Sequence, residues 1–335
     1  MFKPLVSFVR NFNKDILKMP NQNTENKIFW IDNLRAFATL SVIVLHVSFN
    51  IVDLYGKVPD GHWWIGNIID GAARFCVPIF LMITGALLIP KTDDFPTFLR
   101  RRFTRILYPF LFWSFVYIAF NLLGKFLHGE QLVNLHTTYF IFDQLKNGAS
   151  YQFWYVYMII GLYLFLPIIG RWTRSAPTNE IAYFLLIWAF TFFLNFVFIS
   201  KYFPMFDLIN FSGYAGYIVL GYLLTRINIY TEPNLKYKIL FIIISGIIIT
   251  VVGTYIFSKL DQKFNGLFYS YLTPNVLAAS FGFYIYFKSY FNRKGAISTI
   301  VSLVSRYSFG NYLVHVLVLA QLFRFGIESN FINPL

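Results

Sequence analysis

Charged residues and cysteine are both scarce in this chain of 335 residues. Asp, Glu, Lys and Arg make up 13% of it, about half the share found in an ordinary water-soluble domain. Hydrophobic residues make up 57%, more than the core of a soluble protein of this size can bury. The composition therefore excludes a soluble enzyme, a secreted module and a disordered chain. Cys76 is the only cysteine, so no disulfide within the chain is possible.

The sequence motifs of several kinds of catalysis are also absent. The chain has no Gly-x-Ser-x-Gly elbow, no Cys/His metal-binding spacing, no Walker loop and no dinucleotide fingerprint. Residue 51, five after His46, is an isoleucine, so the His-x4-Asp signature of soluble acyltransferases is missing. These absences argue against a serine hydrolase, an ATPase and a metalloenzyme, and we expect no metal site.

Long apolar runs recur along the chain instead. A membrane-spanning helix needs about 20 mostly apolar residues. Aromatic residues, which are typical of membrane interfaces, make up 21% of the chain. The sequence therefore predicts an all-α, polytopic transmembrane helix bundle of about 9–10 spans. The runs fall at about 29–51, 72–90, 104–124, 153–170, 180–199, 212–228, 238–258, 268–290 and 300–325.

The distribution of positive charge predicts the orientation of these spans. A net charge of +13 would suggest a nucleic-acid partner in a soluble protein. Here most Lys and Arg lie in the amino-terminal tail and in the loops on the same side of the bundle, which the positive-inside rule places in the cytoplasm. We predict a polar cytoplasmic tail at 1–27, a single transmembrane domain at 28–325 and a short carboxyl tail at 326–335, with membrane lipids rather than nucleic acid as partners. The loops predicted outside hold only Lys57, Lys125, Lys146, Lys201, Lys259 and Lys263.

Three ionisable residues lie in the first predicted span: Asp32, Arg35 and His46. Ionisable groups inside a span are costly and are functional candidates by default. Arg35 and His46 are eleven residues apart, so on a helix they share a face at a separation of about 16 Å. Asp32 and Arg35 can pair at i, i+3, and a histidine can exchange a proton near neutral pH. The alternative is that Arg35 reaches the lipid head groups and His46 bonds a neighbouring helix.

Further arginines open the second and third predicted spans. Arg74 follows Asp70 by one helical turn at the outer end of its span, where a partner in the bundle such as Asp70, or an anionic ligand, would account for it. Arg102 and Arg105, also one turn apart, lie in the stretch RRRFTR at 100–105. Guanidinium groups match phosphate oxygens, so this pair could bind one phosphate-bearing ligand. The alternative is an anchor of topology that attracts acidic lipids.

Two further groups of candidates lie later in the chain. Trp154 and Tyr157 belong to an aromatic cluster at an outer boundary, which is typical of an interfacial belt and also of a platform for sugar rings. His315 lies within a predicted span, with Asn311 one turn earlier on the same face. A packing role and a role in the site both remain open for His315.

Five segments of the chain, taken in order, resemble the acyltransferase 3 family of integral-membrane acyltransferases. The resemblance extends over about 30–325. In its small stand-alone form the chain resembles the O-acetyltransferases of bacterial surface polysaccharides, including that of enterobacterial common antigen. The segments are Arg35-x10-His46, VPIFLMITGALL at 77–88, RRFTRI at 101–106, FWYVYMIIGLYLFLPI at 153–168 and SRYSFGNYLVH at 305–315.

The resemblance implies transfer of an acyl group, usually acetyl, from cytoplasmic acetyl-CoA to a hydroxyl of a glycan or lipid-linked glycan outside. It implies a multi-pass protein of the bacterial plasma (inner) membrane, with acyl-CoA as co-substrate and no tightly bound cofactor. A tenth span, common in the family, would require that one predicted run merges two helices. The residues that we expect in the site are His46 and Arg35 for catalysis; Arg102, Arg105 and Asp32 for the donor; and Arg74, Trp154, Tyr157, His315 and Asn311 for the acceptor.

Two other functions share some of these features. A transporter or flippase of glycans or lipids would need no acyl donor, but we find no interrupted helices at matching positions of two halves, as inverted repeats would predict. A membrane-bound acyltransferase of the unrelated MBOAT type would move the key histidine to His315. Substitution of His46 or of His315 distinguishes the two kinds of acyltransferase.

Overall fold

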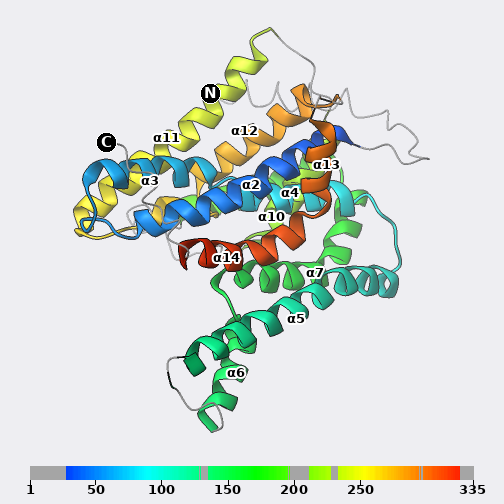
Figure 1. The fold of residues 1–335 in the computed structure, drawn as a ribbon. Coiled ribbons are helices and arrows are strands. Elements are labelled where there is room, and N and C mark those ends of the chain that lie inside the picture. The colour runs from blue at the N-terminus through cyan, green and yellow to red at the C-terminus, as the bar shows by residue number, and fades with distance from the viewer. Residues whose placement is uncertain are drawn as a thin grey trace. The chain divides into compact units, whose positions relative to one another are not determined.

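The structure, a computed structural model, describes residues 28–127, 129, 135–194, 196, 211–227, 233–293, 295 and 297–324. Within these ranges every regular element is a helix and no strand occurs, which confirms the predicted all-α class. The described residues form two compact units (Figure 1). The first takes those of Met1–Lys91 and Ile169–Ser308, and the second takes those of Thr92–Ile168 and Phe309–Glu328.

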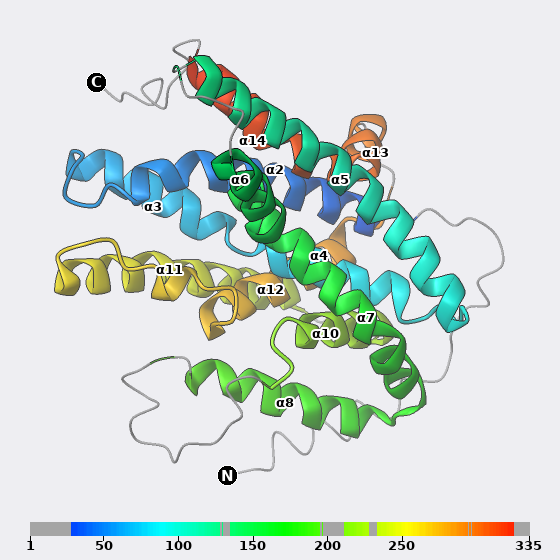
Figure 2. The same cartoon turned by 90° about the horizontal axis from the view of Figure 1, so that it is seen from below.

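The first unit begins with two elements that run side by side, α2 and the pair α3–α4 (Figures 1 and 2). Helix α2 is Phe29–Val52, close to the predicted 29–51. Helices α3 (Asp60–Ala73) and α4 (Cys76–Leu88) follow each other almost directly and together make one candidate span, Asp60–Leu88. The predicted runs 29–51 and 72–90 left residues 52–71 as a connection between two spans, and residues 60–71 of it are helical instead.

The reason for this difference lies in the residues that α3 buries. Its buried face carries Trp63, Asn67 and Asp70, at the three- and four-residue spacing of a helix. Polar groups on that face hide the apolar periodicity that marks a span. The consequence for the site is that Arg74, predicted at the outer end of its span, lies at its middle, as far from Asp60 as from Leu88 along the sequence.

Two glycines allow α4 to cross α10 (Ala215–Arg226) with their backbones in contact. A Cβ atom added at Gly85 would clash with the carbonyl oxygen of Ile218, and one added at Gly221 would clash with that of Met82. Small residues permit such close approach between helices in membranes. Helix α8 (Thr178–Leu194) also packs against α10.

The rest of the first unit consists of α11, α12 and α13. Helices α11 (Leu235–Asp261) and α12 (Pro274–Tyr290) lie side by side, joined by a connection that includes the short 3-10 helix η3 (Leu267–Tyr269) (Figure 1). Helix α13 (Ser298–Arg306) packs against α2. Residues 267–269 and 298–306 are therefore brought to α3 and α2, respectively, from distant parts of the chain.

The second unit is built around α5 (Phe95–Leu127). It also contains α6 (Leu135–Asn147), the 3-10 helix η1 (Tyr151–Phe153), the start of α7 (Trp154–Ser175) and all but the first residue of α14 (Ser308–Arg324). Asp94 accepts a hydrogen bond from the backbone N–H of Thr97 at the start of α5, and hydrogen bonding to Thr97 lowers the pKa of this carboxyl. The core of this unit includes Phe110, Tyr117, Phe153, Val156 and Leu313.

Five of the described helical segments are long and apolar enough to cross a membrane. The predicted run 300–325 is not one span, because it breaks at Tyr307 into α13 and α14, and the nine residues of α13 are too few to cross. The total of about 9–10 spans and the boundaries of the tails remain predictions. The five candidate spans are Phe29–Val52, Asp60–Leu88, Phe95–Leu127, Tyr151–Ser175 and Leu235–Asp261.

Candidate active site

The predicted pair Asp32 and Arg35 forms near the start of α2 with help from a third residue, Ser305 of α13. Ser305 donates a hydrogen bond from Oγ to Oδ1 of Asp32 at 2.7 Å and accepts one from Nη1 of Arg35 at 3.3 Å. The direct approach of Arg35 Nη1 to Asp32 Oδ1 is 3.8 Å, an ion pair but too long for a hydrogen bond. The Ser305 hydroxyl therefore links the two charged groups.

This linkage fixes the direction of the Arg35 side chain. Ser305 is buried, while the side chains of Asp32 and Arg35 keep 22% and 23% of their surface exposed. Thr39 donates from its hydroxyl to the backbone oxygen of Arg35, one turn further along α2. Arg35 is thus held by Ser305 and Asp32 at a partly accessible position.

His46 lies further along the same helix, three turns from Arg35, and is partly exposed. Two residues of α2 contact the α3–α4 segment along one face of the helix. Ser48 donates to Oδ2 of Asp70 at 3.5 Å, and the ring of Phe37 stacks on that of Phe75 at 5.2 Å between centroids. Phe37 and Ser48 are eleven residues apart and share this face, while His46 lies about 200° round the helix from Ser48.

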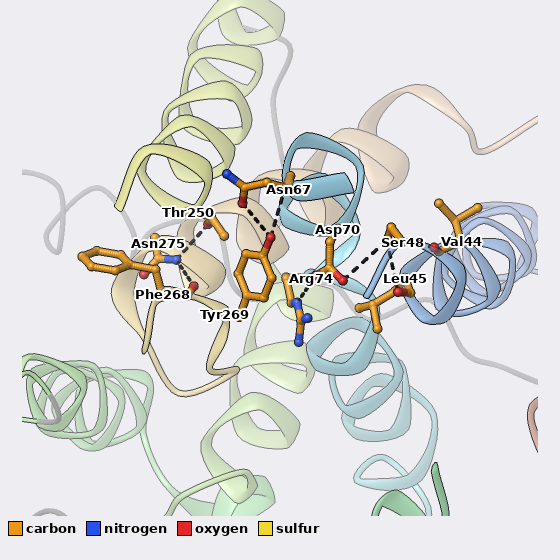
Figure 3. A network of polar contacts seen from close by, with 10 residues as sticks. All are labelled: Val44, Leu45, Ser48, Asn67, Asp70, Arg74, Thr250, Phe268, Tyr269 and Asn275. Carbon is orange, nitrogen blue, oxygen red and sulfur yellow. Dashed lines mark hydrogen bonds and ion pairs between the residues drawn. The ribbon is translucent and has the colours of Figure 1, made fainter. Parts of the chain in front are cut away.

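Asp70 and Arg74 form the buried ion pair that their spacing predicted. Nε of Arg74 lies 2.5 Å from Oδ1 of Asp70 (Figure 3). Asp70 is 0% exposed and Arg74 is 9% exposed, so the pair is removed from water inside the first unit. An ion pair in such surroundings interacts much more strongly than one at the surface.

Aromatic rings surround the guanidinium group of Arg74. Its central carbon lies 4.1 Å from the ring centroid of Tyr269, 5.7 Å from that of Phe49 and 5.9 Å from that of Tyr271. Tyr269 is held in place by its hydroxyl, which donates to Oδ1 of Asn67 at 2.6 Å (Figure 3). These contacts leave Arg74 in a dry, mostly aromatic environment.

One nitrogen of Arg74 has no hydrogen-bond partner within the described part of the chain. This nitrogen, Nη2, is buried. A buried donor without an acceptor costs about 1–3 kcal/mol, and such a group in a native protein calls for an explanation. The sequence had indicated that Arg74 needs a partner or an anionic ligand, and Asp70 satisfies it only in part.

The predicted donor arginines lie in the second unit, on α5. Arg101 pairs with Asp93 at 3.0 Å, while Arg102 has its guanidinium carbon 5.8 Å from the ring centroid of Phe98. Within the described residues, Nε of Arg102 is buried without a partner, and Arg105 is exposed. A shared donor site for Arg102, Arg105 and the Asp32–Arg35 pair remains a prediction, because the two units are described separately.

The predicted acceptor residues other than Arg74 also belong to the second unit. Trp154 is 38% exposed, and the hydroxyl of Tyr157 donates to the backbone oxygen of Leu145 at 2.6 Å. That hydroxyl can still accept a hydrogen bond, although its proton is used. His315 is buried, with Nδ1 2.7 Å from the backbone oxygen of Tyr312, and Asn311 lies one turn before it on α14. Their roles at the acceptor remain predictions.

No metal centre is evident in the described part of the chain. Nowhere in it do three or more His, Cys, Asp or Glu side chains gather as metal ligands. The residues assembled here are a histidine, arginines and their carboxylate partners, which can transfer protons and bind anions.

Comparison with known families identifies the kind of protein. A family model for acyltransferase 3, described as an acyltransferase domain, matches residues 28–335. The chain belongs to the acyltransferase 3 family. No curated protein and no solved structure matches it. Membership in this family, together with the candidate spans, makes the chain a multi-pass membrane acyltransferase, and it counts against the MBOAT alternative.

Proposed function

We propose that this acyltransferase 3 protein moves an acetyl group from cytoplasmic acetyl-CoA to a hydroxyl of a cell-surface polysaccharide or of its lipid-linked precursor. It would do so in the bacterial inner membrane. The observation that best supports this proposal is the arrangement on α2. Arg35, held by Asp32 and Ser305, precedes His46 by eleven residues on a helix long enough to cross the membrane.

The spacing of these residues suits an acyl-CoA that enters from the cytoplasm. Arg35, near the cytoplasmic end of α2, would bind the phosphates of the donor, because guanidinium groups bind phosphate oxygens through paired N–H groups. His46 lies about 16 Å further along the helix, a separation that the extended pantetheine arm of CoA can cover. The thioester would then lie next to a group able to move a proton.

In the reaction that we propose, His46 acts first as a general base and then as a general acid. It takes the proton of the acceptor hydroxyl while the hydroxyl oxygen bonds to the thioester carbonyl carbon. The carbon–sulfur bond then breaks, and the proton passes from His46 to the leaving sulfur. The products are the acetyl ester of the glycan and free CoA, so one ester replaces one thioester. No bound metal or tightly bound cofactor takes part in this proposal.

The second unit supplies the other residues that we assign to the substrates. Arg102 and Arg105 would bind donor phosphates, in addition to Arg35. Trp154 offers an exposed ring on which a sugar can stack, while Tyr157, Asn311 and His315 would contact the acceptor. These assignments require that both units contribute to one site.

Purified protein in proteoliposomes tests this function. Radiolabelled acetyl-CoA is supplied on the side of the amino terminus and envelope glycan on the other, and ester-linked label on the glycan is measured. Label that depends on protein and on acetyl-CoA supports the proposal. Translocation of glycan without any acyl donor, and with no ester formed, would contradict it and favour a flippase. Mass spectrometry of envelope glycans from a deletion strain then identifies the acyl group and the acceptor.

A further inference from the structure

We infer that the short helix α13 lies on the phospholipid surface beside the start of α2, with its outer face buried among the lipids, and that this contact holds Arg35 in place for the donor. The lipid contact goes beyond the proposed function. Its effect on the donor rests on that function. Neither part needs a residue outside the first unit.

The outward face of α13 is apolar. Ile300 and Leu303, together with Ile297 just before the helix and Tyr307 just after it, are each between 51% and 65% exposed. They follow one another at intervals of three, three and four residues, which is the spacing of one helix face. Apolar side chains gathered on an exposed face mark a surface that meets lipid or another protein.

The side of α13 that packs against α2 is the more polar one. Ser305 is buried there and bonds both members of the Asp32–Arg35 pair. Ser298 and Ser302, seven and three residues earlier, lie on the same side with Val301, and all three are partly buried. Serine hydroxyls therefore lie against the protein.

The two sides of α13 are thus the reverse of those of a surface helix in water. Leu303 and Ile300 lie about 160° and about 140° round the helix from the buried Ser305. In a water-soluble protein the apolar stripe of such a helix faces the core and the polar side faces solvent. The arrangement in α13 fits a helix whose outer face is in an apolar medium.

The position of α13 selects the membrane surface as this medium. The helix packs on the first turns of α2, a candidate span, at the end predicted to lie in the cytoplasm. It lies across α2 rather than alongside it (Figures 1 and 2), and its nine residues are too few to cross a membrane. A helix that lies across the end of a span runs along the membrane surface.

Exposed charges next to the apolar face are complementary to phospholipid. Arg306 ends α13, and Arg293 lies five residues before its start; both are exposed. Guanidinium groups bind phosphate oxygens, and an aromatic residue such as Tyr307 is typical of the headgroup level. Interfacial helices combine basic residues with an apolar face buried about 5–10 Å into the boundary between headgroups and acyl chains. These charges favour a phospholipid surface over an apolar protein partner.

The lipid contact and the Arg35 contact are on opposite sides of the same short helix. Lipid that holds the outer face keeps the inner face against α2, where Ser305 bonds Asp32 at 2.7 Å and Arg35 at 3.3 Å. If the outer face loses its hold on the membrane, Ser305 moves away from the pair. The effect on donor binding should then match that of removing the Ser305 hydroxyl.

The placement of α13 is tested without any assay of acyl transfer. Leu303→Cys is made in a Cys76→Ala background, because Cys76 is the only cysteine of the chain, and is labelled with a fluorophore. The protein is placed in nanodiscs of equal parts of phosphatidylcholine and phosphatidylglycerol. Brominated phospholipid quenches labels inside the bilayer, and iodide quenches labels in water. We expect brominated lipid to remove most of the fluorescence and iodide to remove little.

Two further labelled variants complete this experiment. Ile300→Cys, on the same face, should give the same result, so the test does not depend on one variant. Lys57→Cys, exposed between α2 and α3, is the water-facing control and should be quenched mainly by iodide. Stronger quenching of the α13 labels by iodide than by brominated lipid would place this face in water and overturn the inference. Protection of these labels from both quenchers would indicate a protein contact, such as a second copy of the chain, and would also overturn it.

The effect on the donor is tested by the double variant Ile300→Ser with Leu303→Ser, which makes the outer face polar. We expect the KM for acetyl-CoA in proteoliposomes to rise about three- to fivefold, with kcat within a factor of about two. Adding Ser305→Ala should raise KM no further, because both changes act through one contact. Ile300→Leu with Leu303→Ile keeps the face apolar and should retain the wild-type KM.

The outcomes separate this inference from the proposed function. An unchanged KM in the double serine variant, or a KM that rises again when Ser305→Ala is added, would overturn the link between the lipid contact and Arg35. Wild-type protein that transfers no acetyl group would contradict the proposed function. The quenching measurements would still decide whether α13 lies in the lipid surface.

Discussion

Removing the hydroxyl of Ser305 should weaken donor binding without slowing the chemistry. In Ser305→Ala, Arg35 and Asp32 lose the atom that links them, since their direct contact of 3.8 Å is too long for a hydrogen bond. A hydrogen bond to a charged group contributes about 1.5–3 kcal/mol. Because both charged side chains remain about a fifth exposed, water and a closer direct pair recover part of this. We therefore expect a net loss of about 1 kcal/mol in donor binding, roughly fivefold in affinity.

The assay is acetyl transfer in proteoliposomes as a function of acetyl-CoA concentration. If Ser305 positions Arg35 for the donor, the KM for acetyl-CoA rises about fivefold and kcat stays within a factor of about two. Ser302→Ala, one turn earlier on α13, is the matched control and should change neither value. An unchanged KM in Ser305→Ala, or a fall of kcat alone, would refute this account of Arg35.

Two further predictions concern the packing of the first unit and the basic motif of the second. Gly85→Ala should destabilise the protein by about 1–3 kcal/mol, because its Cβ would meet the backbone of α10. Gly161→Ala should not destabilise it, because a Cβ added there has open space. Thermal unfolding in detergent compares the two variants. Arg102→Lys and Arg105→Lys should each weaken acetyl-CoA binding roughly tenfold to a hundredfold, since a lysine cannot form the paired hydrogen bonds of a guanidinium group. Unchanged affinity in both would make the motif an anchor of topology.

Hydrophobic runs predicted those helices whose surfaces are apolar on most sides. Helix α2 is an example, with observed bounds of Phe29–Val52 against a predicted 29–51. Helix α3 was missed because its buried face includes Asn67 and Asp70, whose partners are Val251 for Asn67 and Arg74 and Ser48 for Asp70. The break at Tyr307 was missed because residues on both sides of it are similarly apolar, so composition carries no signal of the interruption.

For the candidate site, sequence spacing predicted contacts within a helix and missed those between helices. The pairs Asp32–Arg35 and Asp70–Arg74 follow from spacings of three and four residues. Ser305 and Tyr269 were not predicted, because they reach the site from more than 190 residues along the chain. For Ser305 one signal was available, since it begins the segment SRYSFGNYLVH that resembles the family.

The most direct test of the account is acetyl transfer by His46→Ala, compared with wild type and with His315→Ala. General acid–base catalysis contributes about 100- to 10,000-fold, so the account predicts a loss of at least about 100-fold for His46→Ala, with membrane insertion and thermal unfolding unchanged. His315→Ala should retain measurable transfer. Acetyl transfer at the wild-type rate by His46→Ala would contradict the central claim that this histidine moves the proton of the acceptor hydroxyl.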